Sequence, residues 1–593
     1  MADNPVYDVL IGGGGLAGQC LARQLKLARP RLSVAVIDWE KRPLPEAAFK
    51  VGEATSELGA HYFAEKLRLK DYLQRDQLLK CGLRFFFGDA QGPIVNRPEY
   101  GPRLFPPITS YQLDRGKLEN DLRQLNESLG VTLWEGFAVE DIVLGEGDAP
   151  HTTVLRERTG GSARAIRSTW VVDCTGRQRV LQNKLGLGLP SPLQHSACWF
   201  RVSGKCDISD LVPRDATEWH DRVPGGVRYH STNHLVGTGY WVWLIPLSSG
   251  NTSVGIVVDE RIHPVATINT CEKAQAWLEA HEPVVARHVA RFEVMDFKHF
   301  RQFSYDTRQF FSTNRWACIG EAAAFLDPFY SPGSDFIGMA NTAVTKLISR
   351  HFDQSLTRAV VEQADATLLQ LHRAFTEVFL DQYPTFGHSR VMTAKVIWDN
   401  ASYWVFVCQM FFQDILLDDE YLDHYRRVFE EFYQLNKQVQ QLFRDWARES
   451  KDSGGYDYLG YVDFPIAVRS HLELGTKKSP RRFLDWIEVN LNRFSAWAVV
   501  LFRIAVEDVA PEALDKIPEE RLTPELVDLR NMDRAITATR SGTRAGTGRN
   551  RLAPEIASLK RQMTKLFPGY TCLQERAGRR PADMAVAAMS TRH

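Results

Sequence analysis

Residues 8–18 read DVLIGGGGLAG, and this stretch decides the fold. The apolar run at 9–11 predicts a short buried parallel strand, and Gly13, Gly15 and Gly18 follow with the G-x-G-x-x-G spacing as a helix begins. Gly13 permits a tight turn, Gly15 lets the backbone approach a pyrophosphate, and Gly18 lets the helix pack closely on the strand. The stretch therefore predicts a dinucleotide-binding unit, without distinguishing FAD from NAD.

A second strand and an acidic residue complete this unit. Residues 19–27 are predicted to continue as a helix, whose free N–H groups and positive dipole end face the phosphates. Residues 32–37 follow as a strand that ends at Asp38, about 20 residues past Gly18, where an acid accepts a hydrogen bond from a ribose hydroxyl. Strand, helix, strand and acid in this order favour a nucleotide-binding fold over an ordinary glycine-rich turn.

The composition restricts the class of protein. Of the 593 residues 44% are hydrophobic, and 72 Lys and Arg balance 72 Asp and Glu, so the chain has no bulk attraction for nucleic acid or an anionic membrane. The nine cysteines are scattered without a C-x-x-C pair, which favours reduced thiols in the cytoplasm. There is no leader pattern, no run of 18 apolar residues and no metal-ligand spacing among the histidines. We therefore expect a soluble, cytoplasmic protein without a metal site and without a nucleic-acid or membrane partner.

Two further strand ends favour FAD over NAD. One predicted strand ends at Asp173 and is followed by the C-T-G turn at 174–176, and another runs into G-E-A-A at 320–323. A nicotinamide cofactor needs only the glycine loop, whereas a flavin lying extended across a domain needs further strand ends to meet its ribityl chain and ring. The loop ahead of the next predicted helix offers backbone donors, with Thr55 or Ser56 as the helix cap, and we expect Thr55 to bind the cofactor.

The pattern of apolar and polar residues divides the chain. We expect an α/β fold, with a Rossmann-like FAD-binding domain over residues 1–380 and an inserted antiparallel substrate sheet at approximately 190–300. The strands predicted for this sheet cover 197–203, 227–231, 234–245 and 252–258. Helical periodicity predicts a helical cap or substrate region over 381–510. Residues 511–593 are predicted to be a basic, partly disordered segment, since 531–593 hold twelve Lys and Arg against four Asp and Glu.

These features resemble the flavoprotein monooxygenase superfamily with the p-hydroxybenzoate-hydroxylase-like fold. The resemblance implies that the acid after Gly320 holds the ribityl chain; this residue is Glu321, where the superfamily has an aspartate. It also implies that Arg115, in the D-R pair at 114–115, approaches the flavin.

Two longer motifs resemble those of the flavin-dependent halogenases, over roughly residues 5–400. Residues 241–246 fit W-x-W-x-I-P and residues 325–333 fit F-x-x-P-x-x-S-x-G. The resemblance implies reduced FAD supplied by a separate flavin reductase, oxygen, and chloride or bromide. It also implies that Trp241 and Trp243 form a wall between the flavin and the substrate. Without the second motif, two core tryptophans on one face of a sheet would be the preferred interpretation.

The resemblance places the halide at the turn that follows, at Ser331, Gly333 and Ser334, because family members bind it there through backbone amides. Pro332 departs from the family pattern, since it has no N–H to donate to an anion. Gly333, Ser334 or a neighbouring side chain would have to compensate.

In the family an essential lysine lies between flavin and substrate and passes the oxidised halogen to the aromatic ring. Lys80 matches the spacing of tryptophan-type members, and Arg84 stands where some phenol-type members have their lysine. A guanidinium stays protonated and cannot do amine chemistry. Lys80 can, if burial beside Leu79 and Phe85 lowers its pKa, and a solvated surface lysine is the alternative. Tyr330 stands where tryptophan-specific members carry an acid, so we expect a phenol, a pyrrole or a carrier-bound ring as substrate.

Two other functions stay open at this point. The first keeps the fold without the halide, as a monooxygenase or dehydrogenase of a natural-product intermediate, and Pro332 is its best support. The second is a flavin-binding scaffold whose basic tail binds a partner. The aromatic residues within 398–412 are typical of a helix core, and they would also suit a cap over a planar ring.

Overall fold

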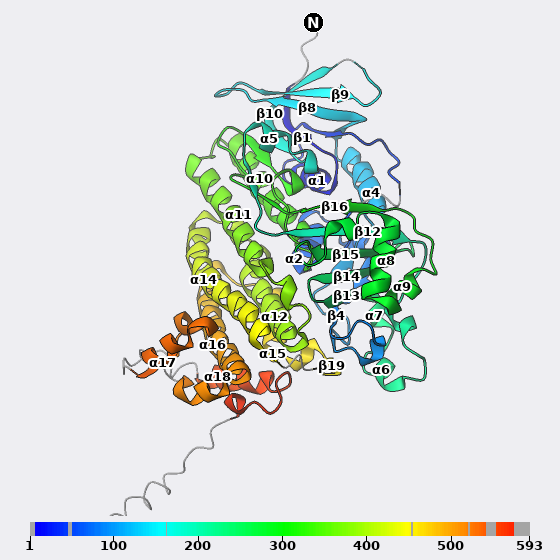
Figure 1. The fold of residues 1–593 in the computed structure, drawn as a ribbon. Helices are drawn as coiled ribbons and strands as arrows, with labels where there is room; N and C mark the ends of the chain where they lie inside the picture. Colours follow the sequence, from blue (N-terminus) through cyan, green and yellow to red (C-terminus); the bar gives the residue numbers. More distant parts are fainter. Residues whose placement is uncertain are drawn as a thin grey trace, which may run out of the picture.

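Two β-sheets and a layer of helices make up the protein (Figure 1). The computed structural model describes residues 6–45, 50–161, 163–451, 455–519, 522–540 and 553–574. In the view of Figure 1 the first sheet lies at the top, the second lies at the right behind α8 and α9, and the long helices α11, α14 and α16 lie at the left.

The first sheet has the order β7-β2-β1-β10-β9-β8, with β18 beside β10. Its bounds are β7 (Val131–Glu135), β2 (Val34–Asp38), β1 (Val6–Gly12), β10 (Arg164–Asp173), β9 (His151–Glu157), β8 (Phe137–Val143) and β18 (Trp316–Cys318). Strands β7, β2, β1, β10 and β18 are parallel, and β9 and β8 add an antiparallel extension. Helix α1 (Leu16–Ala28) packs between α10 (Gly333–Phe352) and α4 (Arg115–Ser128). The predicted strand, helix and second strand around the glycine loop are therefore confirmed.

The second sheet has the order β16-β12-β15-β14-β13-β4-β5-β19. Its bounds are β16 (Lys298–Phe300), β12 (His195–Val202), β15 (Thr252–Asp259), β14 (Tyr240–Pro246), β13 (Thr232–Gly237), β4 (Leu83–Phe86), β5 (Glu99–Tyr100) and β19 (Tyr458–Leu459). Strands β12, β13, β14 and β15 confirm an inserted sheet. Strands β4, β5 and β19, from before and after the insertion, extend it on one side.

Two details of the predicted insertion are wrong. Residues 227–231 are not a strand, because α7 (Val227–His230) forms there directly after Gly225 and Gly226, both at positive φ. Residues 234–245 are not one strand either, because the chain reverses between β13 and β14 at Gly239, whose φ is +82°. Alternation along β14 survives this turn. Trp241 and Trp243 belong to the main core. On the other face of the strand, Val242 and Leu244 pack with residues of α8 (Cys271–His281) and α9 (Pro283–Val289).

The helical layer begins with α10 and covers the edge of both sheets. It contains α11 (Arg358–Phe379), α12 (Ser389–Ser402), the π-helix η8 (Tyr403–Cys408), α13 (Gln409–Phe412), α14 (Asp419–Glu449), α15 (Pro465–Leu472), α16 (Pro480–Val509), α17 (Met532–Arg540) and α18 (Ala553–Met563). Among the described helices, α16 alone has the length and apolar composition of a membrane span, yet 72% of its most apolar window is buried inside the protein.

The short elements connect these layers. They are α2 (Glu57–His61), α3 (Lys70–Asp76), β3 (Leu78–Lys80), β6 (Ser110–Gln112), α5 (Val180–Lys184), β11 (Gly188–Pro190), α6 (Thr217–Asp221) and β17 (Tyr305–Thr307).

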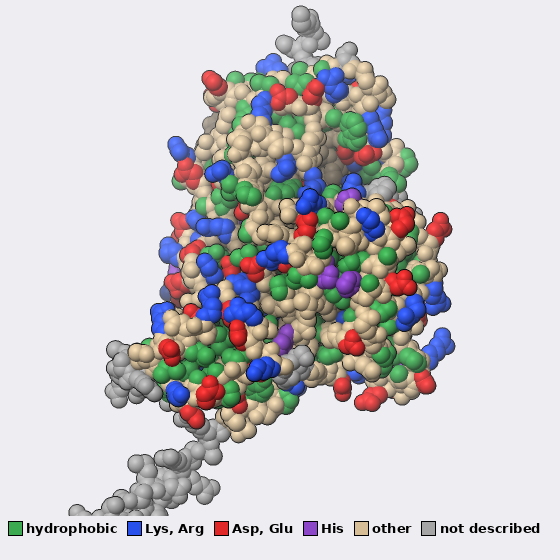
Figure 2. Space-filling model, viewed as in Figure 1, with side chains coloured by type: hydrophobic (Ala, Val, Ile, Leu, Met, Phe, Trp, Pro, Cys, Tyr) green, Lys and Arg blue, Asp and Glu red, His purple; other side chains and the backbone are tan. Residues whose placement is uncertain are grey.

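Part of the predicted basic tail is folded. Within 511–593, helix α18 packs on α16, and Met563, Leu566 and Phe567 are buried there. The rest of the predicted basic segment, 541–552 and 575–593, lies outside the described residues. Basic and acidic side chains are interspersed over the face of the molecule in Figure 2, in keeping with the balanced composition.

Candidate active site

A cavity of about 360 Å³ opens where β1, β10 and β18 end. Ligands bind at this edge in open α/β sheets, outside the carboxyl ends of the strands. Its lining includes Gly15, Gly52, Arg115, Gly176, Arg177, Trp241, Trp243, Gly320, Glu321, Ser331, Gly333 and Ser334. We call it the first cavity. It gathers residues from all three strand ends that the sequence analysis assigned to FAD.

The glycine loop fits a pyrophosphate. A Cβ at Gly13, whose φ is +106°, would lie 2.1 Å from the carbonyl oxygen of Cys174, and a Cβ at Gly18 would lie 2.0 Å from that of Gly13. A Cβ at Gly15 would meet no atom within 4 Å, because Gly15 faces the open cavity. Gly13 and Gly18 thus serve the packing of strand and helix, and Gly15 leaves room for a ligand at the start of α1.

Of the other predicted cofactor residues, two line this cavity and Asp38 is not among its lining residues. Arg115 and Glu321 line it, and Arg115 Nη1 donates to the carbonyl oxygen of Val51 at 2.6 Å. Asp38 ends β2 as predicted, but its carboxylate is paired with Arg123 and accepts the N–H of Glu40 at 3.2 Å.

The position of Thr55 corrects the sequence analysis. Thr55 lines a second cavity instead of the first. Its hydroxyl accepts the backbone N–H of Tyr111 at 2.8 Å and donates to the carbonyl oxygen of the same residue at 3.1 Å, so the side chain ties two segments together. The helix cap is Ser56, at the start of α2.

Trp241 and Trp243 stand side by side in the first cavity, with ring centroids 5.4 Å apart. Trp241 Nε1 donates to the hydroxyl of Tyr383 at 2.7 Å, and this hydroxyl donates to Asp327 at 2.7 Å. The Trp241 ring also packs edge-on against Phe329, at 5.1 Å between centroids. Trp241 is therefore held in place, and hydrogen bonds through Tyr383 join it to the F-x-x-P-x-x-S-x-G segment.

The predicted halide turn is the start of α10, at the rim of the first cavity. The Ser331 N–H is already used, because it donates to the carbonyl oxygen of Pro328 at 2.9 Å, and Pro332 has none. Gly333 and Ser334 occupy the first turn of the helix, where N–H groups have no partner within the helix and the dipole favours an anion. The buried Ser334 hydroxyl also makes no hydrogen bond to the described residues. Three donors thus remain for an anion at Gly333 and Ser334.

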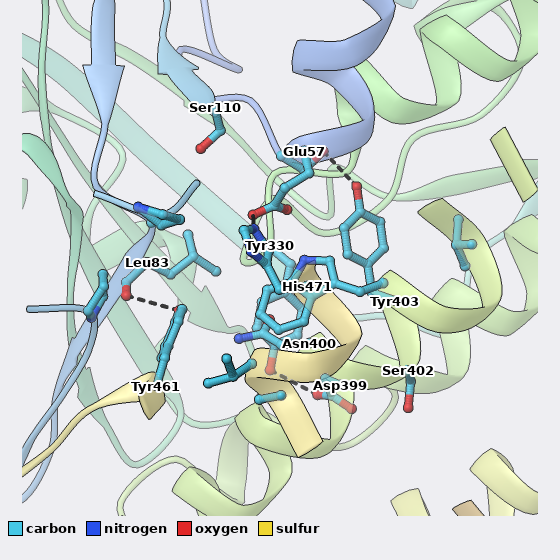
Figure 3. Close-up of a pocket in the computed structure, with 18 of the residues that line it drawn as sticks. Glu57, Leu83, Ser110, Tyr330, Asp399, Asn400, Ser402, Tyr403, Tyr461 and His471 are labelled. Atoms are coloured by element: carbon cyan, nitrogen blue, oxygen red, sulfur yellow. Dashed lines mark hydrogen bonds and ion pairs between the residues drawn. The ribbon is translucent and has the colours of Figure 1, made fainter. Parts of the chain in front are cut away.

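The second cavity, of about 440 Å³, lies between β3, α2 and the helical layer (Figure 3). Its lining is mostly apolar, with polar groups from several elements. The polar residues are Thr55, Ser56, Glu57, Lys80, Arg103, Ser110, Tyr330, Asp335, Asp399, Asn400, Ser402, Tyr403, Asn436, Tyr461 and His471. Trp398 and Phe406 are core residues, whereas Tyr403 and Trp404 of η8 line the cavity.

Lys80 is buried at the end of β3 and lines the second cavity. Its side chain is 3% exposed, and Nζ donates to the carbonyl oxygen of Thr55 at 2.7 Å. Burial lowers the pKa of Lys80 to about 8, against the opposing charges of Glu57 and Asp335. A solvated surface lysine is therefore excluded. Arg84 is buried elsewhere, in an ion pair with Glu99 at 2.5 Å.

Two short segments separate the cavities. Residues 53 and 54 line the first cavity and residues 55 and 56 the second. In the same way residues 331–334 line the first, whereas Tyr330 and Asp335 line the second. Trp241 and Trp243 line the first cavity only. The partition is thus built mainly by the segments around Ala54 and Pro332, and the tryptophans lie on the side of the first cavity.

The sequence analysis missed Glu57, Asp335 and His471 of the second cavity, whereas Tyr403 belongs to the aromatic stretch that it considered as a cap over a planar ring. Asp335 accepts hydrogen bonds from Ser56, from the Gly59 N–H at 3.0 Å and from the Tyr403 hydroxyl at 2.8 Å. Burial raises the pKa of Asp335 to about 7, against these hydrogen bonds. The sequence did contain a signal for two of them. Glu57 directly follows the predicted helix cap Ser56, and Asp335 directly follows the predicted halide residue Ser334.

Tyr330 is joined to a buried polar network behind the cavity. Its hydroxyl donates to Asp399 at 2.8 Å, and Asp399 also accepts from Lys395 at 2.6 Å and from Gln440 at 2.7 Å. The Tyr330 side chain is therefore held in place where it lines the second cavity, and it presents a phenol there instead of a carboxylate.

Comparisons with known proteins agree with this geometry. The family model described as Tryptophan halogenase matches residues 106–380. The flavin-dependent halogenase chlA of Dictyostelium discoideum is 26% identical over 480 residues, covering 76% of this chain and 78% of that protein. The 1H-pyrrole-2-carbonyl-(peptidyl-carrier protein) chlorinase of Pseudomonas fluorescens is 27% identical over 342 residues, covering 55% of this chain and 72% of that protein.

The fold is also that of a solved halogenase. The crystal structure of halogenase PltM in complex with phloroglucinol and FAD superposes with a TM-score of 0.60 at 16% identity, covering 79% of this chain and 95% of that one. This likeness shows the fold.

Proposed function

We propose that this chain, which is similar to the flavin-dependent halogenases, is an FAD-dependent oxidoreductase of that kind and that its two cavities divide the reaction between them. FAD and halide occupy the first cavity, and the aromatic substrate occupies the second. The observation that carries this proposal is Lys80, a buried amine in the second cavity, next to the segment that closes off the first.

The residues of the first cavity suit FAD. Gly15 and the start of α1 would hold the pyrophosphate, Arg115 would approach the flavin ring, and Glu321 would accept a hydrogen bond from a ribityl hydroxyl. Reduced FAD supplies the electrons with which oxygen becomes an oxidant for the halide. A separate flavin reductase would deliver it in the reduced form.

Chloride or bromide would lie at the start of α10. The N–H groups of Gly333 and Ser334 and the Ser334 hydroxyl are the donors available there, and the helix dipole adds a favourable field. These donors compensate for Pro332 and for the used N–H of Ser331. Trp241 and Trp243 would keep bulk water away from this site, and the segments around Ala54 and Pro332 would keep the substrate away.

Lys80 would receive the oxidised halogen from the first cavity and present it to the ring. At neutral pH its ammonium donates hydrogen bonds, and its lowered pKa lets a fraction of the amine form exist. The ring would stack among Tyr403, Trp404 and Tyr461, which line the second cavity.

We infer an electron-rich aromatic substrate, a phenol, a pyrrole or a carrier-bound ring, from the shape and lining of the second cavity. The chlorinase of Pseudomonas fluorescens named above acts on a pyrrole ring bound to a carrier protein.

All nine cysteines are free and eight are buried, which suits a cytoplasmic enzyme.

Product analysis tests the proposal. The FAD-loaded protein is incubated with a flavin reductase, NADH, oxygen, chloride or bromide, and phenol, resorcinol or pyrrole-2-carboxylate, and products are read by mass spectrometry. We expect a halide-dependent mass shift with the isotope pattern of chlorine or bromine. Lack of halogenated product across both halides and a broad aromatic panel would contradict the proposal.

A monooxygenase or dehydrogenase is the alternative that one observation favours, since Ser331 and Pro332 contribute no free N–H to an anion. The same assay without halide distinguishes the two functions. Oxygenated or dehydrogenated product, formed at the same rate with and without halide, would support the alternative.

A further inference from the structure

The second cavity holds a carboxylate besides the lysine, and its role is not accounted for by the delivery of halogen. Glu57 is the first residue of α2, its side chain is 13% exposed, and it lines the cavity together with Lys80. In Figure 3 its carboxylate points away from α2 into the cavity, toward His471. We propose that Glu57 is the base that removes the ring proton when the aromatic substrate is halogenated; this inference rests on the proposed function.

Three carboxylates line the second cavity within the described part of the chain, and two of them are fully engaged. Both oxygens of Asp335 accept hydrogen bonds, from Ser56, Gly59 and Tyr403. Asp399 accepts from Lys395, Gln440 and Tyr330. Glu57 has weaker partners than these two, since its Oε1 lies 3.4 Å from Nε2 of His471 and Trp404 also hydrogen-bonds its carboxylate. It therefore keeps lone pairs for a proton from the substrate.

The surroundings of Glu57 keep it ionised. Burial raises its pKa, but His471 and Trp404 outweigh this effect, so that the pKa of Glu57 lies below its ordinary value. Asp335 in the same cavity shifts in the opposite direction, to about 7, because burial prevails there. Two carboxylates whose environments push their pKa values apart are typical of a site with one base and one acid.

Lys80 and Glu57 together balance the reaction. An electron pair of the ring attacks the halogen of a hypohalous acid held by Lys80, a carbon–halogen bond forms, and the halogen–oxygen bond breaks. The departing hydroxide takes a proton from the Lys80 ammonium and leaves as water. The carbon–hydrogen bond then breaks, its electron pair restores the aromatic ring, and the proton passes to Glu57. Transfer of that proton back to Lys80 resets both residues.

The experiment compares wild type with Glu57→Gln, which keeps the size of the side chain but is no base. Both are assayed with whichever compound of the product screen wild type halogenates fastest, and with its ring-deuterated form. Glu65→Gln is the matched control, because Glu65 is exposed and lies eight residues further along the same helical stretch. Flavin oxidation and halide oxidation are followed in parallel.

We expect Glu57→Gln to lose product formation by about 10²–10⁴-fold, the usual contribution of a general base, with flavin oxidation unchanged. We also expect a primary deuterium isotope effect that wild type and Glu65→Gln lack, because proton removal becomes the slow step. Product formation by Glu57→Gln at the wild-type rate, without an isotope effect, would overturn the inference.

A second variant protects the test against a folding defect. Glu57→Ala opens space for a small carboxylate, so formate or acetate should restore part of the product formation. A Glu57→Ala protein that binds FAD normally and is not rescued, while Glu57→Gln shows no isotope effect, would also overturn the inference. Failure of wild type itself to halogenate any compound would instead contradict the proposed function.

Discussion

Replacing Lys80 by methionine should stabilise the protein at neutral pH while removing its function. Burial lowers the pKa of Lys80 from 10.5 to about 8, which corresponds to a cost of about 3 kcal/mol for carrying the charge in the folded state. Methionine fills a similar volume without a charge. Loss of the 2.7 Å hydrogen bond to Thr55 offsets about 1 kcal/mol of the gain. We therefore expect Lys80→Met to raise the free energy of unfolding at pH 7 by about 2 kcal/mol.

This difference should depend on pH. Because the pKa of Lys80 is lower in the folded chain than in the unfolded chain, the unfolded chain binds more protons between about pH 8 and pH 10.5. Wild type consequently gains stability as the pH rises through that window. Below about pH 8 the full cost is present, and above pH 10.5 it is gone. Lys80→Met lacks this titration, so its advantage should vanish at high pH.

Urea unfolding of the FAD-saturated proteins at neutral and alkaline pH measures both effects. Lys437→Met is the matched control, because Lys437 is exposed on α14, and its curves should follow those of wild type. The reasoning would be refuted if Lys80→Met were less stable than wild type at pH 7 and its stability changed with pH in the same way.

Four further substitutions test other parts of the protein. Gly15→Ala should keep the fold, because its Cβ meets no atom within 4 Å, yet it should weaken FAD binding in a fluorescence titration. Gly13→Ala should instead lower the melting temperature of the FAD-free protein, because its Cβ would lie 2.1 Å from the carbonyl oxygen of Cys174. Normal FAD affinity in Gly15→Ala would count against the pyrophosphate site. Ser334→Ala should raise the halide KM about 10- to 100-fold without changing the FAD affinity, since a charge-assisted hydrogen bond contributes about 1.5–3 kcal/mol, and an unchanged KM would argue against a halide at α10. Asp335→Asn should make unfolding less sensitive to pH between about 4 and 7, because the raised pKa of Asp335 makes wild type lose stability as the pH rises through that range; identical pH profiles would contradict it.

The sequence was sufficient where the structure depends on neighbouring residues. The glycine loop, β1, α1 and β2 follow from spacing alone, because backbone conformation at Gly13 and close packing at Gly18 are local requirements. Residues 227–230 were misread because V-R-Y-H has the alternation of a strand, whereas two preceding glycines at positive φ begin a helical turn.

Residues brought together from distant parts of the chain could not be found in the same way. Ser56 and Asp335 are hydrogen-bonded across 279 residues, and Tyr403 joins Asp335 from the helical layer. The resemblance to a known family identified Lys80 as a candidate. It did not predict that Lys80 hydrogen-bonds to Thr55 in a buried position, or that Glu57 lines the same cavity. These contacts depend on how α2, α10 and η8 pack, which no local pattern encodes.

Separation of flavin and halogenation chemistry is best measured on Lys80→Met with reductase, NADH, oxygen and bromide in rapid-mixing experiments that record flavin oxidation and brominated product together. We expect flavin oxidation at the wild-type rate and loss of brominated product, because the oxidant forms in the first cavity and needs Lys80 to reach the ring in the second. Bromination at the wild-type rate without Lys80 would contradict this division of the reaction between two cavities.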